Sequence, residues 1–255
     1  MKCLLTGCNG FIARNFIKYF TEYEIIGLDI RENDRVVTIV QNVSDEIAGN
    51  YDIVVHAASG FSNDVDMFNA NFLGTKRCIE VATRSGCPLL YISSAEASEP
   101  VRTYGIMKLA GECLVKTYGK GLIVRPYHIY GPGMNLDDGR IQSEIIKAIS
   151  NKSVLKMRGD GTAIRTFTHV NDLLRAIKIV IQSGEAGEIY DVSNEAEATT
   201  IENLCKSLCI QYILGEEKHP IKTNIGDSTK VKNLGWEARI DTINGFIATG
   251  RNPQI

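Results

Sequence analysis

The chain has 255 residues and is 44% hydrophobic, which is enough for one large domain or two unequal lobes with a sizeable core. Its 28 basic and 30 acidic residues give a net charge of −2 without a run of one sign, which argues against nucleic acid or an anionic membrane as a partner. The N-terminal apolar run is too short for a signal peptide, and no apolar stretch approaches the ~20 residues of a membrane span. We therefore predict a cytoplasmic protein that binds small molecules.

The seven cysteines include no C-x-x-C pair, so they indicate neither a disulfide framework nor a zinc ribbon. Cys205 and Cys209 lie one helical turn apart, but no neighbouring side chain clearly completes a metal site. We predict buried thiols on a helix and no metal.

Short apolar runs alternate with helical patterns through the first two-thirds of the chain. The predicted strands are 2–7, 23–29, 35–40, 51–59, 88–94 and 121–126, and the predicted helices are 11–20, 65–86 and one that begins near Tyr104. This alternation predicts an α/β fold, a Rossmann-type doubly wound parallel sheet with helices on both faces.

After residue 140 the elements become shorter, with helices predicted at 141–150, 171–183 and from about 200, and strands at 154–157 and 188–193. We predict a dinucleotide-binding domain at 1–135 and a small C-terminal substrate-binding lobe at 136–255. The chain is expected to recross between the two near 160–195.

A glycine-rich turn joins the first predicted strand to the first helix. Gly7 and Gly10 let the backbone approach a pyrophosphate and direct the helix N-terminus at it. Asp29 ends the next strand, 19 residues after Gly10, where its carboxylate can accept hydrogen bonds from the adenosine ribose. A carboxylate there repels the 2′-phosphate of NADP and favours NAD, and Arg31 offsets part of that repulsion.

Eight motifs, in order, resemble those of the extended short-chain dehydrogenase/reductase family, in its nucleotide-sugar epimerase, dehydratase and reductase branch. The motifs are TGCNGFIA, VVHAAS, NFLGT, YISS, YGIMKLAGE, RPYHIYGPG, GDGTAIRTFTHVNDL and KVKNLGW. They cover nearly the whole chain and depart from the family pattern at Ala13, which replaces a glycine, and at His128, which replaces an asparagine.

The resemblance implies NAD as the cofactor, with NADP less favoured. The residues that it assigns to cofactor binding come from the turn, the strand ends and the Tyr104 helix. They are Gly7, Asn9, Gly10, Phe11, Ile12, Asp29, Ile30, Arg31, Asn42, Val43, Ala57, Ala58, Ser59, Asn71, Tyr104, Lys108, Tyr127 and His128.

Tyr104 and Lys108 lie at i and i+4 and so share one face of a helix. A free tyrosine, with a pKa of ~10, is a weak base at neutral pH, and a neighbouring ammonium favours the phenolate. The resemblance implies that Tyr104 removes a sugar hydroxyl proton, that Lys108 binds the nicotinamide ribose and that Ser94 binds the hydroxyl; Ser93 is the alternative serine. A purely structural Tyr104 and Lys108 pair is the competing interpretation.

The residues after Ser94 bear on the reaction. Family dehydratases carry T-D-E here, whereas this chain has Ser94, Ala95 and Glu96, so a dehydratase would lack its aspartate. UDP-glucuronate decarboxylases carry a glutamate at the third position, which Glu96 matches. We predict a nucleotide-sugar epimerase with a keto-sugar intermediate, and keep a keto-sugar reductase, a decarboxylase and a non-catalytic NAD-binding sensor or scaffold as alternatives.

Substrate binding is predicted for Ser94, His128 and Arg165, with Arg165 matching a family arginine that pairs with the nucleotide diphosphate. Tyr104 follows Ser94 by only ten positions, so the substrate wall should be short, and the small second lobe suits a small or unusual sugar. The helices around 71–82 and 104–115 resemble those that form a four-helix interface in the family, and we expect a homodimer.

Overall fold

The computed structural model describes residues 1–217 and 223–254. Its central sheet has seven strands in the order β11-β6-β5-β4-β1-β2-β3, and the pairs from β6 to β3 are all parallel. These strands are β1 (Lys2–Thr6), β2 (Glu24–Asp29), β3 (Val37–Val40), β4 (Ile53–His56), β5 (Leu89–Ile92), β6 (Gly121–Pro126) and β11 (Ile189–Val192). The predicted Rossmann-type sheet is confirmed.

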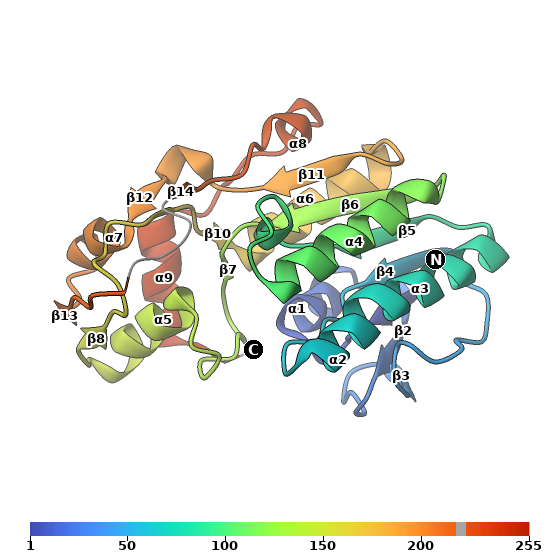
Figure 1. Cartoon of the computed structure of the whole chain (residues 1–255), viewed down its shortest axis with the longest axis horizontal. Helices are drawn as coiled ribbons and strands as arrows, with labels where there is room; N and C mark the ends of the chain where they lie inside the picture. The colour runs from blue at the N-terminus through green and yellow to red at the C-terminus, as the bar shows by residue number, and fades with distance from the viewer. Residues whose placement is uncertain (218–222, 255) are drawn as a thin grey trace. The chain divides into compact units, whose positions relative to one another are not determined.

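Helices cover both faces of this sheet because the chain runs outward from its centre in two directions. Strands β1 to β3 proceed one way and β4 to β6 the other, so right-handed crossovers place α1 on one face and α3 and α4 on the opposite face. Figure 1 shows α3 and α4 side by side along the sheet. These elements are α1 (Phe11–Tyr19), α2 (Asp64–Phe68), η1 (Asn69–Leu73), α3 (Gly74–Ser85), η2 (Ala95–Ala97) and α4 (Thr103–Thr117).

The order in which the chain adds strands reverses between β1 and β4: β2 and β3 follow on one side of this pair, and β5 and β6 follow on the other. In open parallel sheets such a reversal leaves a crevice at the carboxyl ends of the strands, where ligands bind. Strands β4 and β5 are buried along their whole length, as expected for strands covered on both faces. The sequence between these strand ends and the following helices therefore supplies the candidate site.

The predicted helix at 65–86 consists of three consecutive helical segments. Between α2 and α3, the five residues of η1 form a π-helical turn that contains the fully buried Asn71. A π-helical turn inserts one residue into a helix and often marks a functional position. Sequence periodicity did not reveal it, because the flanking turns keep their helical pattern.

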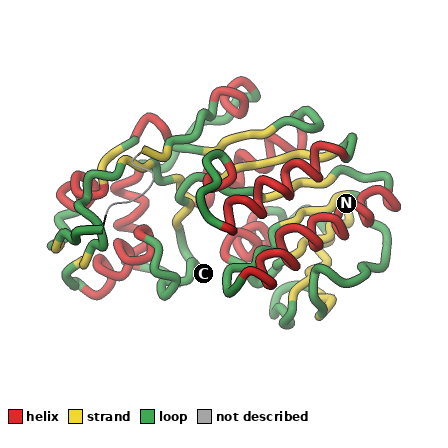
Figure 2. The backbone as a smooth tube through the Cα atoms, viewed as in Figure 1, coloured by secondary structure: helices red, strands yellow, loops and turns green. Residues whose placement is uncertain are grey.

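The chain divides into two compact units, 1–125 with 177–190 and 126–176 with 191–255. Our sequence-based division was at residue 135, with a recrossing near 160–195. In Figure 2 the first unit alternates strand and helix, whereas the second unit has short strands separated by loops.

The second unit contains three small sheets, ordered β10-β7, β12-β9-β14 and β13-β8. Its core includes Tyr130 stacked on Phe246, with ring centroids 4.1 Å apart, and Phe167 packed edge-on against Phe246 at 5.3 Å. The elements in or entering this unit are β7 (Ile129–Tyr130), α5 (Ile141–Asn151), β8 (Leu155–Lys156), β9 (Ile164–Arg165), β10 (Thr168–His169), α6 (Val170–Ser183), η3 (Glu195–Glu197), β12 (Thr199–Thr200), α7 (Ile201–Ser207), β13 (Tyr212–Ile213), β14 (Thr223–Asn224), α8 (Thr229–Asn233) and α9 (Thr242–Arg251).

The prediction of two buried thiols on one helix was wrong for Cys209. Cys205 is buried on α7, but the helix ends at Ser207, and Cys209 is exposed with a φ of +53°. All seven cysteines are free thiols. Across residues 1–217 and 223–254, no group of three or more His, Cys, Asp or Glu side chains could hold a metal ion, and no helix is long and apolar enough to cross a membrane.

Candidate active site

The glycine turn after β1 is closely packed and leads directly into α1. Gly7 has a φ of +69°, and a Cβ built there would lie 2.6 Å from the Cα of Ala58, so a side chain is excluded by both strain and space. The Gly10 N–H donates to the Gly7 carbonyl at 2.8 Å, and α1 begins at the next residue. The first N–H groups of α1 thus follow directly on the turn, where they can bind an anion.

Asp29 is fixed at the end of β2, beside this turn. Its carboxylate accepts from the backbone N–H of Asn9 at 3.1 Å and from that of Arg31 at 3.3 Å. The Asn9 side chain in turn donates to the carbonyls of Arg31 and Glu32. These bonds hold a negative charge at the position predicted to recognise the adenosine ribose.

A chain of buried hydrogen bonds holds the loop after β4 against β1 and α3. Thr75 donates its hydroxyl proton to the Asn71 carbonyl at 2.7 Å, so its oxygen must accept from Nε2–H of His56 at 3.1 Å. Nδ1 of His56 then accepts from the Thr6 hydroxyl at 2.7 Å, and the Thr6 oxygen accepts from the Ala58 N–H at 3.3 Å. The chain fixes one neutral histidine tautomer.

Burial of His56 lowers its pKa to about 3, and the positive charge of Lys108 adds to the effect. The imidazole therefore stays neutral at physiological pH and keeps its donor and acceptor ends. The N–H of Ala57 donates to the Thr6 carbonyl at 3.3 Å and so also ties this loop to the end of β1. The Ser59 hydroxyl donates to the Asn71 side chain at 2.8 Å, and that amide donates to Gly60.

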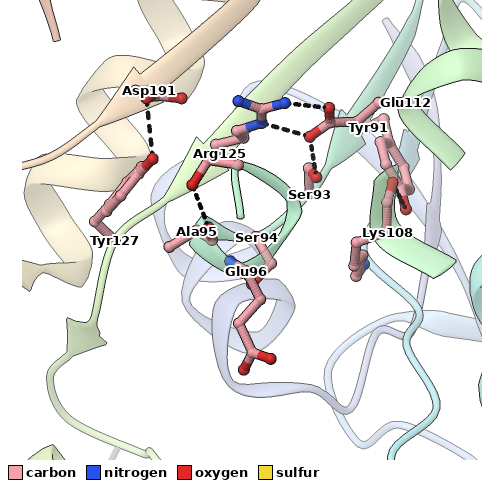
Figure 3. A network of polar contacts seen from close by, with 11 residues as sticks. Tyr91, Ser93, Ser94, Ala95, Glu96, Lys108, Glu112, Arg125, Tyr127 and Asp191 are labelled. Carbon is pink, nitrogen blue, oxygen red and sulfur yellow. Dashed lines mark hydrogen bonds and ion pairs between the residues drawn. The ribbon is translucent and has the colours of Figure 1, made fainter. Parts of the chain in front are cut away.

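The two serines after β5 have different environments. Ser93 is 3% exposed and donates its hydroxyl proton to the Glu112 carboxylate at 2.5 Å. Glu112 also receives two hydrogen bonds of 2.6 Å from the Arg125 guanidinium, an arrangement that Figure 3 shows. Ser94 is half-buried and accepts from the Glu96 N–H at 3.2 Å, which leaves its hydroxyl proton for another acceptor.

Lys108 extends from α4 to the end of β5. Its Nζ donates to the Ile92 carbonyl at 2.9 Å and lies 5.0 Å from the centre of the Tyr91 ring and 6.0 Å from that of Tyr104. Burial lowers the pKa of this ammonium to about 7, while the charge of Glu112 opposes the shift. The side chain is 2% exposed, so Lys108 lies in the interior close to the predicted base.

Tyr104 lies in the first turn of α4, where the backbone of η2 contacts the helix. A Cβ built on Gly105 would lie 2.5 Å from the Glu96 carbonyl oxygen, so the helix approaches η2 at a distance that only glycine permits. The Tyr104 ring packs against Phe61, with centroids 4.9 Å apart and planes inclined at 32°. In Figure 3 the Glu96 carboxylate extends away from Glu112 and Arg125.

The other predicted cofactor residues of the first unit lie around the same strand ends. Phe11 and Ile12 open α1 and are half-buried, and Ile30 follows β2 with 68% of its surface exposed. Asn42 accepts from the N–H and the hydroxyl of Ser44. Val43 is buried in the hydrophobic core, so only its backbone is expected to reach a cofactor.

The remaining predicted residues belong to the second unit. Tyr127 is 2% exposed and its hydroxyl donates to Asp191 at 3.0 Å, while His128 has a φ of +40° and its ring lies 5.8 Å from that of Phe167. Arg165 is 5% exposed on β9, the middle strand of its sheet, and its pKa is lowered by burial.

Sequence reasoning missed the side chains that support the predicted set. Thr6, His56 and Thr75 stand in three separate motifs, and Glu112 and Arg125 stand in two others. The motifs were recognised, but pairing between them depends on which strand ends are adjacent. The signal available was the presence of a polar residue in each motif at a position where the apolar pattern predicts burial.

Comparisons with known proteins identify the family of the chain. A family model described as the NAD dependent epimerase/dehydratase family matches residues 3–193, three-quarters of the chain. The chain belongs to this family. The predicted family, its class of NAD-dependent enzymes and NAD as the family's cofactor are thereby confirmed.

Individual relatives are distant. A trifunctional UDP-glucose 4,6-dehydratase, epimerase and reductase of Arabidopsis thaliana is 24% identical over 96% of this chain, which spans 46% of that protein. UDP-glucuronic acid decarboxylase 1 of Arabidopsis thaliana is 23% identical over 96% of the chain and 68% of the relative. The UDP-glucuronic acid 4-epimerase of Bacillus cereus, solved with UDP-glucuronic acid and NAD, has a TM-score of 0.83, 21% identity and 98% coverage of both chains.

Proposed function

We propose that the protein is an NAD-dependent nucleotide-sugar epimerase that works through a keto-sugar intermediate, with Tyr104 as the base. The observation that carries the proposal is the grouping of Ser94, Tyr104 and Lys108 at the end of β5, with the Gly7 turn at the end of β1, which is separated from β5 by β4 in the same parallel sheet. Membership of the NAD dependent epimerase/dehydratase family supports it.

NAD suits the residues of the first unit on two grounds. The positive φ of Gly7 and its close packing on Ala58 keep the turn free of a side chain, so its backbone can approach a pyrophosphate, and the N-terminus of α1 complements the charge of that group. Asp29 presents a fixed carboxylate to ribose hydroxyls and would repel a 2′-phosphate. When bound, NAD supplies a hydride acceptor and donor for the sugar carbon.

The side chains of the chain then have separate tasks. The hydroxyl of Ser94 binds the reacting sugar hydroxyl, and the phenolate oxygen of Tyr104 takes that hydroxyl's proton as the carbon becomes a ketone. Lys108, held by the Ile92 carbonyl, favours the phenolate when charged and donates to a cofactor ribose. After the keto sugar presents its other face, Tyr104 would return the proton to the oxygen as the carbon is reduced again, which gives the epimer.

A UDP-glucuronate decarboxylase is the second candidate, favoured by Glu96. This glutamate lies two residues after Ser94 and matches the residue found in such decarboxylases, and UDP-glucuronic acid decarboxylases are among the relatives. The same Ser94, Tyr104 and Lys108 set would oxidise the sugar, after which loss of the carboxyl group follows. A keto-sugar reductase would use the set in the reducing direction.

Product analysis separates these reactions. We would incubate the purified protein with UDP- and dTDP-linked hexoses and UDP-glucuronic acid and identify products by chromatography and mass spectrometry. An epimer of unchanged mass supports the proposal, loss of CO2 supports the decarboxylase, and consumption of added NADH with a keto sugar supports the reductase. Tyr104→Phe should lower turnover at least ~10²-fold; unchanged turnover would contradict the assignment of the base.

We further propose that the second unit binds the nucleotide part of the substrate. Arg165 is buried in the middle of its sheet with its guanidinium bonded to the Ile164 carbonyl at 2.7 Å, which fits a fixed partner for a diphosphate. Arg165→Met should raise KM for the nucleotide sugar by ~10-fold or more with a smaller change in kcat. His128 is proposed to contact substrate and nicotinamide, and Tyr127 the cofactor.

A homodimer formed through the helices around 71–82 and 104–115 remains our proposal for the assembly. Light scattering at micromolar concentration tests it directly. A monomer under those conditions would contradict it.

A further inference from the structure

Phe61 is an aromatic side chain of the loop after β4 that the proposed reaction has not used. Its side chain is 51% exposed. Its covered side lies against Tyr104, with the two ring centroids 4.9 Å apart and the planes inclined at 32°. This separation lies within the range of favourable aromatic pairs.

The backbone of Phe61 is anchored on both sides. Its N–H donates to the Asp66 carboxylate at 3.1 Å, and the N–H of Ser62 donates to the same carboxylate oxygen at 3.2 Å. On the other side, the Gly60 carbonyl accepts from the buried amide of Asn71 at 3.3 Å. Successive residues of the loop are therefore held by two different helical segments, which gives the exposed ring a defined position.

We propose that Phe61 is a positioning residue for Tyr104: its ring packs on the phenol and holds the hydroxyl in the orientation that proton transfer requires. The inference rests on the proposed function, in which Tyr104 is the base. Proton transfer depends on hydrogen-bond geometry between base and substrate, and a displacement of about 1 Å can cost ~10²-fold in rate. Phe61 also covers part of the Tyr104 ring from water.

The kinetic test compares Phe61→Ala with Phe61→Tyr and with Phe68→Ala. Phe61→Ala should lower kcat about 10- to 100-fold with less than about a threefold change in KM, because the phenol loses its orientation while the substrate keeps its other contacts. Phe61→Tyr retains a ring and should restore most of kcat. Phe68 is the matched control, since it is 41% exposed and packs on Phe72 at 5.3 Å.

A spectroscopic measurement reports on the ring contact without turnover. With 3-fluorotyrosine incorporated at position 104, the ¹⁹F resonance of the purified protein should shift and broaden in Phe61→Ala, return towards its original position in Phe61→Tyr, and stay unchanged in Phe68→Ala. An unchanged resonance in Phe61→Ala would overturn the positioning role.

The outcomes for the two proposals are distinguishable. If Tyr104→Phe is inactive and Phe61→Ala turns over like the unmodified protein, Tyr104 is the base and the role of Phe61 is wrong. If Tyr104→Phe keeps full turnover, the proposed function is wrong and the role of Phe61 in it falls as well. Equal losses of kcat in Phe61→Ala and Phe68→Ala would also overturn the inference, because a general loosening of α2 would explain both.

Discussion

Lys108 should make the stability of the cofactor-free protein depend on pH between about pH 7 and pH 10. Burial lowers the pKa of this lysine from 10.5 to about 7. Between these values the unfolded chain binds a proton that the folded chain does not, so stability rises as pH rises. Below pH 7 both states are protonated, and the cost of the buried charge is fully present.

The expected change follows from these two pKa values. Between pH 7 and pH 9 the free energy of unfolding should increase by about 2 kcal/mol through Lys108 alone. Lys108→Met removes the titrating group and retains an apolar chain. Urea unfolding curves at intervals over this range should therefore show the unmodified protein gaining about 2 kcal/mol relative to Lys108→Met.

Two controls isolate this contribution. Lys116→Met changes an exposed lysine of the same helix and should leave the dependence of the unmodified protein intact. Burial raises the pKa of Cys78, so ionisation of this thiol in the unfolded chain opposes stability at high pH, but it does so in every variant and cancels in the difference. Parallel curves for the unmodified protein and Lys108→Met would refute the reasoning.

Three further predictions concern the residues around the site. Gly7→Ala places a Cβ 2.6 Å from the Ala58 Cα at a φ of +69°, and should weaken NAD binding at least ~10-fold in calorimetric titration; unchanged affinity would contradict the fit of the turn. Ser93→Ala should lower the free energy of unfolding by about 1–3 kcal/mol in urea, because Glu112 loses a buried donor, and a neutral effect would count against that bond. Because the pKa of His56 is lowered to about 3, the free energy of unfolding should fall by about 3 kcal/mol as pH falls from 6.5 to 4, since the unfolded chain takes up the proton first. His56→Gln should lack this component in acid titrations. The same acid dependence in both proteins would disprove the prediction.

Most of the fold could be predicted from local patterns. The seven strands of the central sheet were predicted from apolar runs, and the longer helices from α1 to α6 from periodic patterns, whereas β7, β10 and α9 of the second unit were not predicted. The π-helical turn around Asn71 was hidden because its neighbours on both sides are helical. The exposed Cys209 was missed because Cys209 itself has the left-handed backbone conformation just after α7, a position where glycine is the usual signal in a sequence.

The residues of the candidate site also fall into those that local sequence patterns predicted and those that depend on contacts between distant segments. Residues proposed to contact a ligand, such as Gly7, Asp29 and Tyr104, stand in motifs with fixed spacing, so they could be named from sequence. Contacts between distant segments could not, and the packing of Phe61 on Tyr104 joins positions 43 residues apart. Such a contact depends on which strand ends meet at one edge of the sheet.

Glu96, in the short segment η2 after Ser94, bears on which reaction the protein catalyses. Gly105 contacts the Glu96 carbonyl so closely that the backbone of Glu96 is fixed against α4, and Glu96 precedes Tyr104 by only eight positions. A fixed backbone limits the Glu96 carboxylate to a small set of positions, and Figure 3 shows it directed away from Glu112 and Arg125. If Glu96 took part in decarboxylation, Glu96→Gln would abolish CO2 release, whereas an epimerase that uses only Ser94 and Tyr104 would retain turnover. Because the contact with Gly105 fixes the Glu96 backbone, substitution of the Glu96 side chain is a decisive test of the reaction.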